Sequence, residues 1–106
     1  MYEGFTVAGW LDEIRPGTTR RVVVNGVPVL LANVDGTLHA VDDMCTHEDS
    51  SLSLGCLRGE WVECTLHGSR FSVITGEPVE EPATEALRTW AVRIEDGRIL
   101  VRVNDR

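Results

Sequence analysis

Two short motifs in the middle of the chain combine a thiol with an imidazole. The first is Cys45-Thr46-His47, and the second, after sixteen intervening residues, is Cys64-Thr65-Leu66-His67. In an extended Cys-x-His segment both side chains point to one side of the backbone, about 6–7 Å apart at Cα. Gly68 follows the second motif and permits a close backbone approach because it has no Cβ. Two such loops facing each other would enclose a metal centre with two sulfur and two nitrogen ligands.

Four chemistries are compatible with this arrangement. A structural zinc ion accepts two Cys and two His, but zinc fingers usually pair like ligands in sequence. A two-iron cluster with two thiolates on one iron and two histidines on the other suits the mixed loops better, since each pair takes one ligand from each loop. A Cys–His nucleophilic pair would be unusual on two similar short loops. Four unconnected core residues would require a coincidence of spacing and turn context. The spacing therefore favours the iron cluster and leaves the other three open.

Both flanks of this region have the pattern of antiparallel strands joined by tight turns. Valine-rich segments end at Asn25-Gly26 and at Asp35-Gly36, and such dipeptides between β-forming residues are strong hairpin signals because both turn residues need positive φ. They predict a three-stranded meander over residues 21–41. Apolar and polar residues then alternate over residues 90–103 around Asp96-Gly97, which predicts a half-buried final hairpin.

The region between the meander and the hairpin is rich in Gly, Ser, Cys, His and Pro. It contains two short strand candidates, residues 60–64 and 70–74, and a weak helical pattern over residues 84–88. His39 precedes the region within a predicted strand, and we expect it to be a residue of the strand face rather than a ligand. Long loops in compact domains are commonly functional. We therefore predict an all-β fold, an antiparallel sandwich or barrel with a loop-rich insertion that holds the motifs.

Length and composition limit the possible partners. The chain has 106 residues, 42% of them apolar, which fits a single domain over residues 1–106 with a real core. We expect a base of about residues 1–42 and 83–106, with the cluster-binding subdomain, about residues 43–82, inserted between them. A net charge of −7 argues against nucleic acid and anionic membranes as partners.

Other features of the composition bear on the compartment. No apolar run approaches the roughly 20 residues of a membrane span, and the N-terminus does not resemble a signal peptide. Three cysteines, an odd number, argue against a disulfide framework. The third, Cys56, has no histidine at ligand spacing, and we expect a structural thiol. We therefore expect a soluble, cytoplasmic protein.

The two motifs, their sixteen-residue gap and the Gly68-Ser69-Arg70-Phe71 segment that follows resemble the signature of the Rieske [2Fe–2S] family. The resemblance extends from the strand before the first motif, through a proline-containing loop, to the closing hairpin. It implies a Rieske-type base with a cluster-binding insertion and one [2Fe–2S] cluster per chain. The ligands that it implies are Cys45 and Cys64 on one iron, and His47 and His67 on the other through Nδ1.

Departures from the respiratory members of this family indicate the subclass. Respiratory Rieske proteins carry two extra cysteines, whose positions are Ser50 and Leu66 here, so no disulfide links the loops. Ser69 occupies the position of a serine that donates to the cluster, but a tyrosine with a similar role is replaced by Phe71. Hydrogen bonds to sulfur stabilise the reduced cluster, so the loss of one lowers the reduction potential. We predict a value near the low end of the Rieske range, about −150 mV.

With no membrane anchor and no disulfide, the chain resembles the ferredoxins of bacterial aromatic-ring-hydroxylating dioxygenase systems. The resemblance implies a carrier that passes single electrons from an NAD(P)H-dependent reductase to a terminal oxygenase in the degradation of aromatic compounds. It implies transient docking of both partners at the cluster tip and no catalysis by the chain alone. One alternative is a small Rieske-type subunit of another reductase, such as assimilatory nitrite reductase. Another is a zinc-stabilised, redox-inert binding module.

Acidic residues are concentrated in the loops expected around the cluster. They form either an ordinary solvated surface or a docking ring that steers the carrier onto basic partners. The residues are Asp42, Asp43, Glu48, Asp49, Glu77, Glu80, Glu81 and Glu85.

Overall fold

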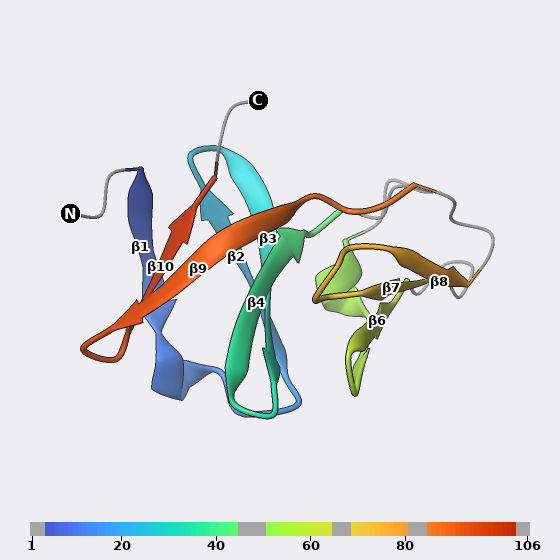
Figure 1. The fold of residues 1–106 in the computed structure, drawn as a ribbon, viewed down its shortest axis with the longest axis horizontal. Coiled ribbons are helices and arrows are strands. Elements are labelled where there is room, and N and C mark those ends of the chain that lie inside the picture. Colours follow the sequence, from blue (N-terminus) through green and yellow to red (C-terminus); the bar gives the residue numbers. More distant parts are fainter. Residues whose placement is uncertain (1–3, 45–50, 65–68, 81–84, 104–106) are drawn as a thin grey trace.

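In a computed structural model the chain forms two antiparallel β-sheets that lie side by side (Figure 1). The structure describes residues 4–44, 51–64, 69–80 and 85–103. The larger sheet has the spatial order β1-β10-β9-β4-β3-β2, and the smaller sheet has the order β5-β6-β7-β8. This architecture confirms the all-β prediction.

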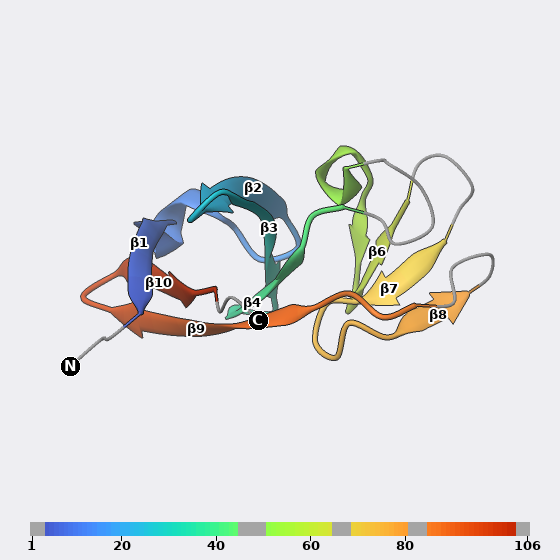
Figure 2. The same ribbon diagram turned by 90° about the horizontal axis from the view of Figure 1, so that it is seen from above.

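The larger sheet comprises β1 (Phe5–Trp10), β2 (Thr19–Val24), β3 (Val27–Val34), β4 (Thr37–Asp42), β9 (Thr89–Glu95) and β10 (Arg98–Arg102). The smaller sheet comprises β5 (Leu57–Arg58), β6 (Trp61–Glu63), β7 (Arg70–Ser72) and β8 (Pro78–Glu80). Two single 3-10 turns, η1 (Leu11–Glu13) and η2 (Leu52–Leu54), connect strands. Seen from above, the larger sheet curls until β1 approaches β2, as in a barrel (Figure 2).

Strand β3 is buried on both of its faces. Val29 and Leu31 point into the curled larger sheet, where they pack with residues of β10, while Leu30 and Ala32 pack with the smaller sheet. All four are 0% exposed. A strand whose two faces both pack against apolar residues does not need to alternate with polar residues, which explains the continuous apolar run of β3. The two sheets therefore share β3 and its neighbour β4 as a common wall.

The predicted meander and final hairpin are confirmed. Strands β2, β3 and β4 pair consecutively, and β9 pairs with β10. Asn25, Asp35 and Asp96 begin the three turns with φ of 52°, 52° and 53°. The local turn chemistry is therefore sufficient to predict these hairpins.

Other parts of the fold differ from the sequence-based expectation. Strands β1, β5 and β8 were not expected, and β6 and β7 are shorter than the candidates at residues 60–64 and 70–74. The helical pattern over residues 84–88 was wrong for residues 85–88, which contain no helix, while Thr84 lies outside the described residues. Backbone hydrogen bonds in this stretch run instead to neighbouring segments: Leu87 N–H donates to Gly76, and the Arg88 carbonyl accepts from Asp42 N–H.

The smaller sheet lies entirely within residues 43–82, the range predicted for the insertion, and the six strands of the larger sheet lie outside it. The exact division between base and insertion stays a prediction. Neither of the short helical turns among the described residues is long or apolar enough to cross a membrane.

Candidate cluster-binding site

Of the four predicted ligands, only Cys64 is among the described residues; Cys45, His47 and His67 lie outside them. Cys64 directly follows β6, is 1% exposed and forms no disulfide. The described part of the chain contains no group of three His, Cys, Asp or Glu residues able to hold a metal ion. The ligand set therefore stays a prediction, and the described part of the site consists of the segments that flank the motifs.

The second motif lies at the end of the β6–β7 hairpin. Val62 pairs with Phe71 and Glu63 with Arg70. Beyond these pairs, Cys64 N–H donates a 2.7 Å hydrogen bond to the carbonyl oxygen of Ser69. Residues 65–68 thus span a connection whose two ends are held by strand pairing.

The first motif leaves the larger sheet at the end of β4 and returns nearby. Met44 forms an antiparallel bridge with Ser51. Leu52 N–H donates to the carbonyl oxygen of Asp43 over 2.6 Å. Residues 45–50 therefore also begin and end at neighbouring points.

A single buried cluster brings the ends of both connections together. Leu52, which follows the first connection, packs in the same core as Cys64 and Phe71, which flank the second. Gly55 lies directly against β6, where an added Cβ would be 1.9 Å from the carbonyl oxygen of Glu63. Because only glycine fits this close approach, Gly55 allows the segment after the first connection to pack directly against β6, which precedes the second.

A third connection, the predicted proline-containing loop, starts and ends on the same core. Leu87, 3% exposed, belongs to the buried cluster, and its N–H donates to the carbonyl oxygen of Gly76 over 2.7 Å. Gly76 has φ +81°, and an added Cβ would lie 2.2 Å from the Leu87 carbonyl oxygen. The glycine therefore provides both the turn and the close contact.

The hydroxyl of Ser69 provides a test of whether the site fits a [2Fe–2S] cluster. Ser69 is 0% exposed, and its Oγ has no hydrogen-bond partner within the described structure. A buried unpaired hydroxyl costs about 1–3 kcal/mol, so such groups commonly have a partner. A sulfur acceptor beside Cys64 would satisfy it. The nearby Phe71, also 0% exposed, has no hydroxyl to add. The thiol of Cys64 and the Ser69 hydroxyl fit the group that the motifs predict.

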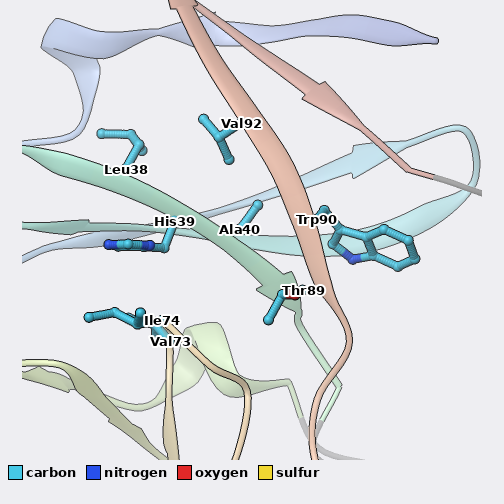
Figure 3. Close-up of a pocket in the computed structure, with 8 residues that line it drawn as sticks. All are labelled: Leu38, His39, Ala40, Val73, Ile74, Thr89, Trp90 and Val92. Atoms are coloured by element: carbon cyan, nitrogen blue, oxygen red, sulfur yellow. The ribbon is translucent and has the colours of Figure 1, made fainter.

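The third histidine is separate from this site. His39 lies in β4, half-buried, and lines a pocket of about 200 Å³ between the two sheets (Figure 3). Ile74, from the turn after β7, lines the same pocket, as does Thr89 at the start of β9. The structure thus places His39 on a strand face, as predicted.

Two of the acidic residues near the first motif are bound to arginines. Asp43 is 0% exposed and pairs with Arg21, and the Asp42 side chain is 17% exposed and pairs with Arg88. The Asp43 carboxylate is therefore buried and the Asp42 carboxylate is mostly covered, each with an arginine partner for its charge, so neither a solvated surface nor a docking ring describes these two residues. Sequence reasoning also missed these arginines, which lie in other strands or connections.

The other acidic residues are distributed differently from the prediction. Glu77 and Glu85 are exposed, but the backbone of Glu77 pairs with Ser72, at the end of β7 away from the second motif. Glu48, Asp49 and Glu81 lie outside the described residues, as does the side chain of Glu80. An acidic docking surface that includes Glu48, Asp49, Glu80 or Glu81 therefore stays a prediction.

The sequence matches the Rieske [2Fe-2S] domain over residues 5–91. The chain belongs to the Rieske family, whose domain carries a [2Fe–2S] cluster, and the cofactor prediction is thereby confirmed.

A curated relative from Ralstonia, the ferredoxin component of naphthalene 1,2-dioxygenase/salicylate 5-hydroxylase systems, is 37% identical over 103 residues, which are 97% of this chain and 99% of the relative. A solved chain from a complex of reduced oxygenase and oxidized ferredoxin in carbazole 1,9a-dioxygenase is 35% identical, with a TM-score of 0.90 and coverage of 94% of each chain. A candidate nitrite reductase NADPH small subunit is 26% identical, with a TM-score of 0.78 and coverage of 93% of this chain and 98% of that one. The predicted resemblance to dioxygenase ferredoxins, which are electron carriers rather than oxygenases, is confirmed.

Proposed function

We propose that the chain is the ferredoxin component of a bacterial aromatic-ring dioxygenase system, a cytoplasmic carrier that takes single electrons from an NAD(P)H-dependent reductase and delivers them to a terminal oxygenase. The observation that carries this proposal is the 37% identity to a ferredoxin component over 97% of this chain and 99% of that relative. Because the organic substrate binds the oxygenase and not the carrier, the proposal names the class of system and no individual substrate.

In this proposal Cys45 and Cys64 hold one iron, and His47 and His67 hold the other. The cluster supplies a one-electron couple. Cys64, 1% exposed, would place its thiolate on the buried side of the site, away from water. Ser69 would donate its otherwise unpaired Oγ–H to sulfur and so stabilise the reduced state. Phe71 adds no second donor, which supports a potential near the low end of the Rieske range, about −150 mV.

A spectroscopic experiment tests the cofactor and its ligands. The purified protein should be coloured, and the dithionite-reduced form should give the electron paramagnetic resonance signal of a Rieske cluster. Cys45→Ser and Cys64→Ser should each lose the cluster. Cys56→Ser is the matched control, because Cys56 is exposed and lies outside both motifs, and it should retain the cluster fully. A colourless protein with bound zinc would contradict the proposal.

A reconstituted assay tests the partners. Reductase and oxygenase of a dioxygenase system should turn over an aromatic substrate only when this protein is added. The alternative, a small subunit of a nitrite reductase, draws on the 26% identical structure. It would be favoured if the protein bound a nitrite reductase large subunit and failed to support every dioxygenase tested.

A further inference from the structure

Asp43 is a carboxylate buried at the point where the chain leaves the larger sheet for the first motif. It follows the last residue of β4, precedes Cys45 by two positions and is 0% exposed. Removing a carboxylate from water is strongly unfavourable unless charged and hydrogen-bonding partners compensate for the lost hydration. Its partners therefore indicate what this residue does.

The side chain of Asp43 binds the segment that follows the first motif. Its Oδ1 accepts a 2.9 Å hydrogen bond from Ser53 N–H, and its Oδ2 accepts one from the hydroxyl of Ser51. The backbone carbonyl of Asp43 also accepts from Leu52 N–H over 2.6 Å. One residue before the ligand segment thus binds three consecutive residues just after it.

Asp43 is also anchored to the larger sheet. Its N–H donates to the carbonyl oxygen of Pro28 in β3 over 3.1 Å, and its Oδ2 accepts from Nε of Arg21 in β2 over 3.0 Å. Arg21 is 47% exposed, so this ion pair alone adds little stability. Its more specific effect is to place a positive charge against the buried negative one.

The two motifs are held by different means. Strand pairing between β6 and β7 continues up to Cys64 and Ser69 on either side of the second motif. The first motif is flanked in the described structure by one isolated bridge, between Met44 and Ser51. At the first motif, hydrogen bonds to the Asp43 carboxylate therefore hold the two ends together, as strand pairing does at the second motif.

We propose that Asp43 is a positioning residue, whose hydrogen bonds hold together the two ends of the segment carrying Cys45 and His47. In this proposal the charges of Asp43 and Arg21 also influence the reduction potential of the cluster. Asp43 is two positions from Cys45 in the chain, so their Cα atoms are at most about 7.6 Å apart. A nearby negative charge disfavours the reduced cluster, and the guanidinium of Arg21 counteracts it. The inference rests on the proposed function, because it takes Cys45 and His47 as ligands.

Charge-changing variants of the cluster-loaded full chain test the inference. Asp43→Asn keeps the shape of the side chain and removes its charge, so the cluster should be retained and its midpoint potential should rise. Arg21→Gln should lower the midpoint potential, and the double variant should return towards wild type. Asp43→Ala, which removes the hydrogen bonds of the carboxylate, should lose most of its iron and sulfide per chain. Arg20→Gln and Asp12→Asn are the matched controls, because both residues are exposed and no described contact links either to Asp43, and they should leave the potential unchanged.

The outcomes separate this inference from a purely structural role and from the proposed function. Potentials equal to wild type in Asp43→Asn and Arg21→Gln, or shifts in the same direction, would overturn the inference. If Asp43→Asn fails to fold, Arg21→Gln decides by itself: a lower potential supports the inference and an unchanged one overturns it. Cys45→Ser distinguishes a failure of the ligand assignment from a failure of the role proposed for Asp43. A Cys45→Ser protein that keeps its Rieske spectrum overturns the ligand assignment, whereas loss of the cluster there with unshifted charge variants overturns this inference alone.

Discussion

The indole Nε1 of Trp90 donates a 3.1 Å hydrogen bond to Oδ1 of Asp42, a residue 48 positions earlier in the chain. The other oxygen of Asp42 accepts from Nε of Arg88 over 2.7 Å, and the guanidinium of Arg88 lies 4.9 Å from the centre of the Trp90 ring. This triad joins the end of β4, just before the first motif, to the strand that follows the proline-containing loop. It thereby fixes two of the three connections at the candidate site to each other.

Removal of the shared carboxylate should destabilise this junction. We expect Asp42→Ala to lower the free energy of unfolding by about 1–3 kcal/mol, because it leaves the partly buried Trp90 N–H without its acceptor. Arg88→Ala is the comparison: Arg88 is 64% exposed, and its loss should cost about 1 kcal/mol or less. Denaturant unfolding of the two variants under identical conditions measures the difference. Equal losses would contradict the role assigned to the Trp90–Asp42 bond.

Gly76 and Gly26 offer a matched pair for the third connection. Their φ angles are +81° and +80°, so replacement by alanine costs each about 1–2 kcal/mol of backbone strain. An added Cβ at Gly26 meets nothing within 4 Å, whereas at Gly76 it would be 2.2 Å from the backbone oxygen of Leu87. Gly76→Ala should therefore lose a further ~1–3 kcal/mol, measured by chemical unfolding. The same loss in both variants would show that the contact with Leu87 relaxes freely.

The unpaired hydroxyl of Ser69 predicts a change in reduction potential. Ser69→Ala should lower the midpoint potential of the cluster-loaded protein, because the reduced state loses a donor to sulfur. Ser72→Ala is the control: it is the same substitution at the far end of β7, where Oγ accepts from the N–H groups of Ile74 and Thr75 at 3.2 Å each. It should leave the potential unchanged. A redox titration in which the two variants agree would argue against a cluster beside Ser69.

Because Asp42 and Asp43 are paired with arginines, the test of electrostatic docking uses other acidic residues. Charge reversal by Glu48→Arg should slow electron transfer to a dioxygenase partner at low salt, with the defect shrinking as salt screens the charge. Glu77→Arg is the same change at an exposed position at the far end of β7 from the second motif, and it should have little effect. Stopped-flow rates over a range of ionic strengths measure both. Identical salt profiles for the two variants would favour an ordinary solvated surface over a docking ring.

Local chemistry explains which parts of the fold could be predicted. Asn25, Asp35 and Asp96 each precede a glycine and adopt positive φ in a tight turn, so each turn and its flanking strands can be recognised in the sequence. Strand β1 was missed because, within the described part of the chain, it pairs with β10 near the other end of the sequence, and because this pairing is interrupted between Val7 and Gly9. Strands β5 and β8 were missed because two or three residues carry too little pattern.

By itself, the sequence determined the motif residues Cys45, His47, Cys64 and His67 and the cofactor chemistry that their types imply, since thiolate and imidazole donors are properties of the residues. The tertiary structure alone decided the environment of Asp42 and Asp43. Both are acidic residues beside a motif, and from sequence alone such residues are expected to be exposed to solvent. Asp43 is buried and Asp42 is mostly covered because Arg21, Arg88 and Trp90, each between 22 and 48 positions from the carboxylate that it contacts, are brought to them by the packing of the sheets. Burial and pairing depend on which distant segments meet in space, which a local pattern does not encode.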